Sequence, residues 1–121
     1  MSKRIIGYKK LMDAVSIAQA ATAYTDSMRF ERCTGTVGVL FKSTAGTVTI
    51  TQQCSLDEKT WYDPVDAAAS ALGTVCTAKA VTTGTWTSYS PVMAPYIRFK
   101  VVETNTAATV VTVTLALQEE G

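Results

Sequence analysis

Carboxylates are the side chains of this chain best suited to catalysis, and four of them fall close together. The stretch CSLDEKTWYDPVD, residues 54–66, contains Asp57, Glu58, Asp63 and Asp66. Two carboxyl groups about 5–10 Å apart across a cleft can hydrolyse a glycosidic bond if one of them has a raised pKa. Such pairs sit in deep clefts, which a short hairpin on a small domain seldom builds. We therefore interpret the acids as solvated residues of a turn and keep a small glycosidase only as an alternative.

Other catalytic and metal-binding chemistry lacks the residues that it needs. The chain has no histidine, which excludes Ser-His and Cys-His nucleophiles and the commonest imidazole metal ligands. Residues 57–61, D-E-K-T-W, lack the spaced oxygen ligands of a calcium loop and carry Lys59 in their middle. The glycines are scattered and form no phosphate-binding loop. We predict that the protein is not an enzyme, has no catalytic residue and holds no metal or cofactor.

Cysteine content and charge restrict the compartment and the partners. Cys33, Cys54 and Cys76 are odd in number and widely spaced, which favours buried free thiols in a reducing compartment, with a Cys33–Cys54 disulfide as the alternative. The net charge of +1 gives no field that would attract nucleic acid or an anionic membrane. The run LMDAVSIAQAA, residues 11–21, is interrupted by polar residues and suits neither a signal peptide nor a membrane span. We therefore expect no nucleic-acid or membrane partner and no export by the ordinary secretory route.

Alternating apolar and polar residues dominate the middle and the end of the chain. The pattern is typical of half-buried strands and covers residues 36–43, 46–53, 96–102 and 108–118. Shorter segments rich in β-formers lie at residues 22–30, 60–65, 74–81 and 85–92. About eight strands at this spacing predict an all-β fold, a two-sheet antiparallel β-sandwich of the jelly-roll or Ig-like kind.

The core and the connections follow from the same pattern. The predicted core contains Ile50, Phe99, Val101, Val113 and Leu115. Residues 9–21 fit both a helical stripe and an alternating strand, and we favour a strand because no N-cap precedes them and several are mediocre helix formers. Residues 66–73 are expected to form a loop or a short helix turn, and residues 105–108 a hairpin turn.

Five aromatic residues suit either a sugar-binding face or the packing between two sheets. They are Trp61, Tyr62, Trp86, Tyr89 and Tyr96. An exposed planar row of rings would indicate a carbohydrate-binding module, whereas a sandwich of this size needs large side chains to fill its interior. We favour packing, and keep a carbohydrate-binding or host-attachment module as the alternative function.

The first ten residues are basic and precede the first predicted strand. They have too few apolar residues to build a core of their own, so we predict an N-terminal basic arm over residues 1–10 and a single sandwich domain over residues 11–121. In an assembly such an arm would become ordered against a neighbouring subunit, with its cations on an acidic surface. The predicted partner-binding residues are Lys3, Arg4, Ile5, Ile6, Tyr8, Lys9 and Lys10.

The turn sequence and its flanks resemble a known family. SLDEKTW, residues 55–61, followed by a second aromatic, is similar to the S-x-D-G-x-x-W hairpin of many small β-sandwich structural proteins of tailed bacteriophage virions. The resemblance runs from Leu11 to Gln118 and includes LMDAVSIAQAATAYTDS, a hairpin in FERCTGTVGVLFKSTAGTVTITQQCS, the strand PYIRFKVVET and a terminal hairpin ending in LALQEE. Glu58 stands where the pattern has glycine, so we expect a turn with an ordinary negative φ at this residue.

The resemblance implies a non-enzymatic structural protein of a bacteriophage virion. The implied role is a decoration or cement protein on the head, with a connector, tail or fibre component as the alternative. The implied partners are the major capsid protein or other virion subunits, and the chain would form a homo-oligomer within the assembly. It would be made in the cytoplasm of the host bacterium and reside in the virion.

Overall fold

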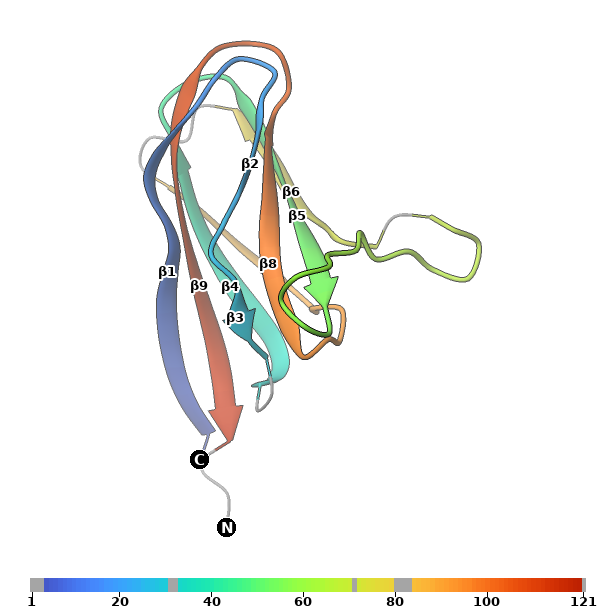
Figure 1. The fold of residues 1–121 in the computed structure, drawn as a ribbon. Helices are drawn as coiled ribbons and strands as arrows, with labels where there is room; N and C mark the ends of the chain where they lie inside the picture. The colour runs from blue at the N-terminus through green and yellow to red at the C-terminus, as the bar shows by residue number, and fades with distance from the viewer. Residues whose placement is uncertain (1–3, 31–32, 71, 80–83, 121) are drawn as a thin grey trace.

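Two antiparallel sheets packed face to face form the protein in the computed structural model, which describes residues 4–30, 33–70, 72–79 and 84–120 (Figure 1). The four-stranded sheet has the order β1 (Arg4–Ile17), β9 (Thr109–Glu120), β4 (Cys33–Ser43) and β7 (Thr85–Tyr89). The five-stranded sheet has the order β2 (Thr22–Tyr24), β8 (Tyr96–Glu103), β5 (Thr47–Ser55) and β6 (Thr74–Lys79), with β3 (Met28–Arg29) also paired to β8. The predicted all-β, two-sheet antiparallel sandwich is confirmed. The described residues include no helix long and apolar enough to cross a membrane.

The chain visits the two sheets in the order of a jelly roll. Its first and last strands, β1 and β9, pair with each other, and β2 and β3 lie along the same edge of β8, so that together they occupy one of eight strand positions. The connections from β4 to β5 and from β8 to β9 cross between the sheets. The predictions of a hairpin turn at residues 105–108 and of a hairpin within residues 30–55 are therefore wrong, because each of these turns joins strands of different sheets.

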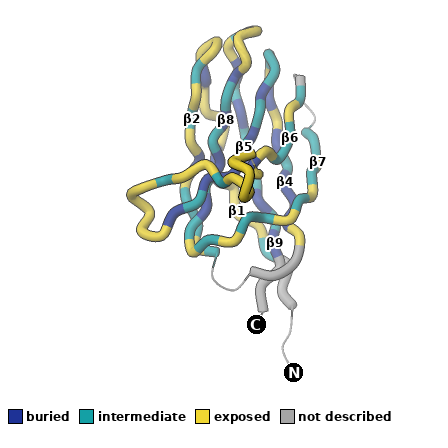
Figure 2. The backbone as a smooth tube through the Cα atoms, turned by 90° about the vertical axis from the view of Figure 1, so that its right-hand side faces the viewer, coloured by how far each residue is buried: buried dark blue, intermediate teal, exposed yellow. Residues whose placement is uncertain are grey.

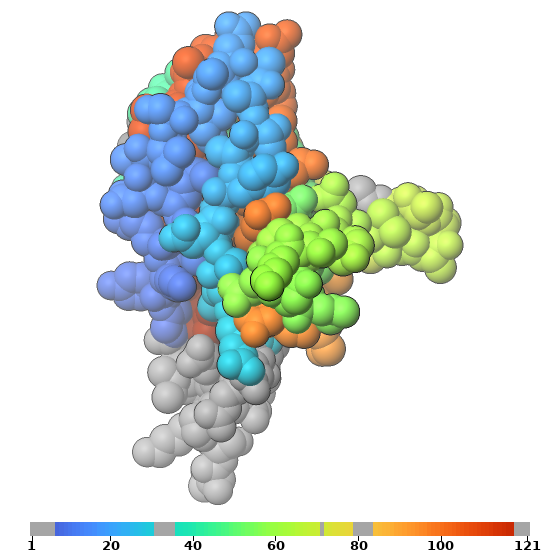
Figure 3. Space-filling model, in the orientation of Figure 1, coloured from blue at the N-terminus to red at the C-terminus, as the bar shows by residue number. Residues whose placement is uncertain are grey.

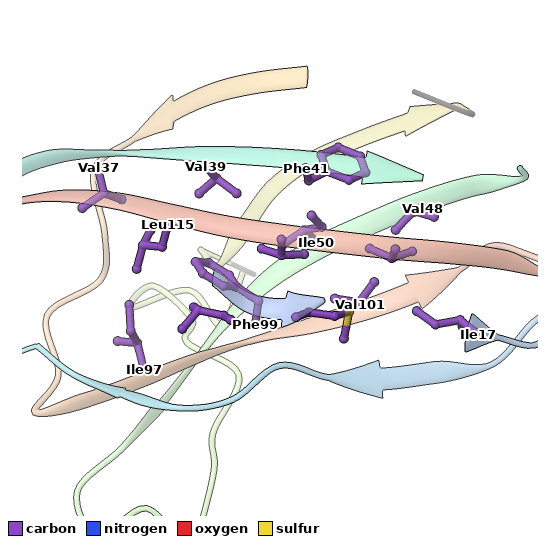
Figure 4. Close-up of a cluster of buried hydrophobic side chains, with 14 of the residues drawn as sticks. Ile17, Val37, Val39, Phe41, Val48, Ile50, Ile97, Phe99, Val101 and Leu115 are labelled. Carbon is purple, nitrogen blue, oxygen red and sulfur yellow. The ribbon is translucent and has the colours of Figure 1, made fainter. Parts of the chain in front are cut away.

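The core lies between the two sheets and is built from alternate residues of the long strands. The predicted core residues Ile50, Phe99, Val101, Val113 and Leu115 are all fully buried. Figure 4 shows most of them, with side chains from β4, β5 and β8 meeting in one layer. Burying a side chain of this kind stabilises the fold by about 1.5–3 kcal/mol, so the alternation in the sequence is sufficient to hold the sheets together.

The N-terminal segment belongs to the sandwich. Residues 4–10 pair with the C-terminal half of β9, with Arg4 opposite Glu120 and Lys10 opposite Thr114. The prediction of an arm that precedes the first strand is therefore wrong for residues 4–10, and Lys3 lies outside the described residues. The physical reason is that the backbone N–H and C=O groups of β9 need partners along the whole strand, and β1 supplies them on one edge.

β1 changes register twice, between Lys10 and Met12 and between Met12 and Val15. Ala14 has a φ of 49°. Leu11 and Met12, which are adjacent in the sequence, are both buried. A β-bulge inserts an extra residue and so interrupts the alternation of faces. This explains why the sequence there is compatible with a helical stripe as well as with an alternating strand, and the favoured strand is confirmed as far as Ile17.

Between β5 and β6 the chain leaves the sandwich and forms a loop that we call the projecting loop, residues 56–70 and 72–73 (Figures 1 and 2). Most of its residues are exposed. The loop expected over residues 66–73 is confirmed for the part that the structure describes. The short strand expected at residues 60–65 does not form, and Tyr62 pairs with Cys54 in an isolated bridge, because the chain turns away from the sheet at this point.

Candidate functional site

Ser55 and Asp57 close the turn that follows β5. Asp57 Oδ1 accepts hydrogen bonds from the backbone N–H groups of Lys59 and Thr60, both at 2.9 Å, and Ser55 Oγ accepts one from the N–H of Glu58, also at 2.9 Å. The backbone N–H groups of Thr60 and Lys59 lower the pKa of Asp57. A general acid needs the opposite shift, so this carboxylate serves its own turn and the interpretation as a turn is confirmed.

Two further acids of the stretch, Asp63 and Asp66, also have structural partners. Asp66 Oδ1 accepts hydrogen bonds from two backbone N–H groups of the projecting loop, at 2.8 and 2.9 Å. Asp63 accepts one from Gln53 Nε2 at 2.9 Å and lies 3.5 Å from Lys100 Nζ. Among the described residues, no group of three or more His, Cys, Asp or Glu is placed to hold a metal ion. The acids therefore shape and attach the loop.

Glu58 adopts the left-handed conformation, with a φ of 61°. The expected turn with an ordinary negative φ is wrong, because the bonds that Ser55 and Asp57 make to the backbone fix the chain in this conformation regardless of the side chain. Left-handed backbone costs a residue other than glycine about 1–2 kcal/mol. Glu58 offsets part of this cost by accepting a hydrogen bond from Ser27 Oγ at 2.6 Å.

Exchanging Glu58 tests this conformation. The free energy of unfolding of Glu58→Gly is expected to be about 1 kcal/mol higher than that of Glu58→Ala. Both variants lose the hydrogen bond to Ser27, and only glycine removes the steric cost of a positive φ. Urea denaturation followed by circular dichroism measures the difference. Equal stabilities of the two variants would show that the turn does not hold this residue in the left-handed region.

Trp61 packs on the outer surface of the five-stranded sheet. The guanidinium carbon of Arg98 lies 4.5 Å from the centre of the Trp61 ring and 4.2 Å from the centre of the Tyr24 ring. Arg98 Nε also donates a hydrogen bond to Gln53 Oε1 at 2.8 Å. The cation between two aromatic rings attaches the projecting loop to the sheet. The expectation that Trp61 fills the core is therefore wrong, since Arg98 points outward from β8.

The remaining aromatic residues divide between core and surface. Tyr89 packs against the core, with its ring edge-to-face against Phe99 at a centroid distance of 6.3 Å, as predicted. Tyr96 is half-buried. Trp86 and Tyr62 are 62% and 60% exposed, so the prediction that they are packing residues is wrong. For Trp86 the reason is the alternation of β7, which turns its neighbours on either side toward the sandwich.

The outer face of the four-stranded sheet contains a hollow of about 500 Å³, which we call the outer groove. Its lining residues come from all four strands of that sheet: Gly7, Tyr8, Lys10, Leu40, Lys42, Trp86, Thr112, Thr114 and Ala116. Ligand sites have volumes of roughly 300–1,000 Å³. The outer groove is therefore the candidate functional site of the described residues.

Strand register gives the outer groove its shape. Tyr8 on β1 lies opposite Ala116 on β9, which in turn lies opposite Gly38 on β4. A Cβ atom at Gly38 would come within 2.4 Å of Trp86 Cζ2, so the indole lies directly over this glycine. The floor of the groove between Tyr8 and Trp86 is low, because Ala116 has only a methyl group and Gly38 has no side chain. The two aromatic residues border this floor from the two edge strands.

Two lysines supply the charge of the outer groove. Lys10 on β1 and Lys42 on β4 are both exposed. Lys10 Nζ lies 3.6 Å from Asp13 Oδ1, and a solvent-exposed pair of this kind is worth only about 0–1 kcal/mol. No acidic residue is among the described residues that line the groove, so these residues present a positive potential to a ligand.

The predicted partner-binding residues fall on different parts of β1. Tyr8, which is 82% exposed, and Lys10 line the outer groove. Lys9 is exposed but does not line the groove. Arg4, Ile5 and Ile6 have Cα partners at residues 118–120 of β9. Sequence reasoning did not find the groove residues of β4, although their alternation with the buried residues of that strand was a signal for outward side chains.

Cys54 and Cys76 carry free thiols, as predicted, so the alternative of a Cys33–Cys54 disulfide is wrong. Burial raises the pKa of both thiols. The side chain of Cys33 lies outside the described part. Both described cysteines therefore behave as half-buried hydrophobic residues with unreactive thiols.

Comparisons with known proteins give a similar fold and no family. A chain in the structure of infectious bursal disease virus Gx strain is 10% identical, with a TM-score of 0.49, and the match covers 97% of this chain and 32% of the viral chain. The protein thus spans about a third of the length of that chain. No family model and no curated protein matches the sequence. At this identity the likeness concerns the β-sandwich fold alone.

Proposed function

We propose that the protein is a non-enzymatic structural subunit of a virion, and specifically a decoration or cement protein on the head of a tailed bacteriophage. The observation that carries this proposal is the turn after β5, where Ser55 and Asp57 make the bonds that explain the S-x-D pattern of the resembled family. Glu58 retains the left-handed backbone that glycine would adopt there. As an analogy at the level of the fold, jelly rolls occur in viral capsid domains and in lectins.

The projecting loop offers a surface suited to another protein. Its exposed large apolar residues are Leu56, Tyr62, Val65 and Leu72, with exposed fractions of 77%, 60%, 53% and 51%. Exposed apolar side chains grouped on one segment are typical of interfaces. In the space-filling view the loop stands out from the body of the sandwich (Figure 3), so a capsid protein or another virion subunit can contact it without disturbing the core.

β1 offers a second contact to the same partner. It is an edge strand of its sheet, and residues 4–10 contain three cations, Arg4, Lys9 and Lys10, and no acid. An exposed edge can accept a strand from another chain. Like charges disfavour a second β1 as that strand, so an acidic segment of a neighbouring subunit is the proposed occupant. The predicted partner-binding residues would then act as a strand edge.

Cosedimentation with assembled heads tests the proposed function. The isolated protein is expected to be monomeric and to pellet with heads of the virus that encodes it. Replacing Leu56 and Leu72 together by serine should weaken binding to heads at least tenfold, because each buried leucine contributes about 1.5–3 kcal/mol to an interface. Met93→Ser is the matched control, since Met93 is 94% exposed and lies outside the projecting loop.

Two results would contradict the proposed function, and a third would contradict the proposed contact surface. Absence of the protein from purified virions, measured by mass spectrometry, would exclude a structural subunit. Detection of the protein only in tails would agree with a structural protein of the virion but would exclude a decoration protein of the head. Equal loss of binding in the leucine variant and in Met93→Ser would show that the projecting loop is not the contact.

A further inference from the structure

We propose that the outer groove binds an acidic oligosaccharide, a function that goes beyond assembly into a virion. The ring of Trp86 is the central part of this site. Its indole lies over Gly38 on the sheet and is nevertheless 62% exposed. A flat aromatic surface held against the backbone and open to water is suited to the C–H face of a sugar ring, with the indole N–H available as a donor.

The site is long enough for more than one sugar unit. On the other side of Trp86 lies a smaller hollow of about 180 Å³, and the two hollows share Trp86 and Ala116. Besides the phenol of Tyr8, the linings of the two hollows include four aliphatic hydroxyl side chains: Thr36, Ser88, Thr112 and Thr114. Hydroxyl groups both donate and accept, as sugar hydroxyls require. A chain of sugars would therefore cross the indole and contact hydroxyls on both sides.

The charge of the site favours an acidic sugar. Lys10 and Lys42 line the larger hollow, and neither lining contains an acidic residue. Asp13 lies 3.6 Å from Lys10 Nζ but is itself 74% exposed, so water screens the pair. A carboxylate or sulfate on the sugar would accept hydrogen bonds from the lysines, which are stronger than those between neutral groups.

An extended peptide fits the groove less well than a saccharide. Peptides that bind sheets gain most of their affinity from backbone hydrogen bonds at an open edge. The floor of the groove is formed by β9 and β4, and each of these strands is paired on both edges. Over these two strands only side chains are therefore available, and the lining combines two aromatic rings, hydroxyl groups and two lysines with the apolar side chains of Leu40 and Ala116.

Calorimetric titration of the intact chain with tetragalacturonate tests the proposal. Binding is expected with a Kd below about 1 mM. The methyl-esterified tetrasaccharide, which has the same rings without the charge, should bind at least about tenfold more weakly. A sulfated tetrasaccharide is the second acidic probe, and binding of either acid supports the site while showing which anion it prefers.

Variants locate the binding. Trp86→Ala should reduce affinity for the bound probe at least about tenfold, and Lys42→Gln about threefold or more. Tyr62→Ala is the matched control, since Tyr62 is equally exposed but lies on the projecting loop. Circular dichroism checks that each variant is folded. Gly38→Ala provides a further variant, because its methyl group must displace the indole and should weaken binding while the ring is still present.

The proposal is overturned if neither acidic probe binds, if the esterified probe binds equally well, or if Trp86→Ala binds as the unaltered chain does. It is also overturned if a tetraglutamate peptide binds as tightly as the acidic sugars and loses as much affinity in Trp86→Ala, since the groove would then recognise charge alone. These outcomes are independent of cosedimentation with heads, so failure here leaves the proposed function in place.

Discussion

Replacing Phe99 by alanine is expected to lower the free energy of unfolding by about 3–5 kcal/mol. The ring is fully buried between the sheets (Figure 4), and it packs edge-to-face on Tyr89 with a centroid distance of 6.3 Å. Truncation removes these contacts and leaves a cavity that the two sheets can close only in part. Because the net stability of a domain is about 5–15 kcal/mol, the loss is a large share of the total. Urea denaturation followed by circular dichroism measures it.

Two further variants make the result specific. Phe99→Leu keeps most of the volume and should cost less than the alanine variant, about 1–2 kcal/mol. Met93→Ala, at a residue that is 94% exposed, should change stability by no more than about 0.5 kcal/mol. A loss below about 1 kcal/mol for Phe99→Ala would place the ring outside the core.

The core was predictable because strand alternation is a local property. Ile50, Phe99 and Val113 each stand between polar neighbours in the sequence, and the structure turns each of them inward. Burial of apolar area fixes the face of each strand independently of which strand lies beside it. The same information does not state which sheet a strand joins. For this reason the turns at residues 44–46 and 104–108 resembled hairpins although they cross between sheets.

The N-terminal strand was missed for a related reason. Residues 4–10 are rich in cations, and composition alone indicated a solvated segment. Their place in the sheet comes from a partner more than 100 residues away, since Arg4 lies opposite Glu120. Sequence patterns contain no information on such pairing between distant segments. The outer groove could not be predicted either, because it depends on Tyr8 and Trp86 being brought to one face by the register of four strands.

Glu103 is a buried carboxylate that connects three crossings of the jelly roll. Its side chain is 1% exposed and accepts hydrogen bonds from the backbone N–H groups of Ala20, Thr47 and Thr106, at 3.0, 3.2 and 3.0 Å. Ala20 and Thr106 lie in the connections from β1 to β2 and from β8 to β9, and Thr47 is the first residue of β5, directly after the connection from β4. The three connections meet at one end of the sandwich (Figure 1). One side chain therefore holds together turns that are distant in sequence.

These bonds make stability depend on pH. The N–H groups of Ala20 and Thr106 favour the charged form and lower the pKa of Glu103 from its ordinary value of 4.5 to about 2. A lowered pKa means that the unfolded chain binds the proton first, so the contribution of Glu103 is fully present above about pH 4.5 and is lost as pH falls toward 2. We expect the Tm of the protein to decrease over this range.

Glu103→Gln is expected to lower the Tm at pH 7 and to flatten the decrease between pH 4.5 and 2, the range set by the shifted pKa. The amide keeps the size of the side chain but exchanges an acceptor for a donor that meets backbone N–H groups, so the three turns lose part of their attachment. Asp13→Asn is the control, because Asp13 is exposed and its variant should follow the unaltered curve. The lowered pKa of Asp57 leaves a residual slope in Glu103→Gln. If Glu103→Gln and Asp13→Asn gave the same thermal profiles at every pH, the carboxylate of Glu103 would not be the group that joins the crossings.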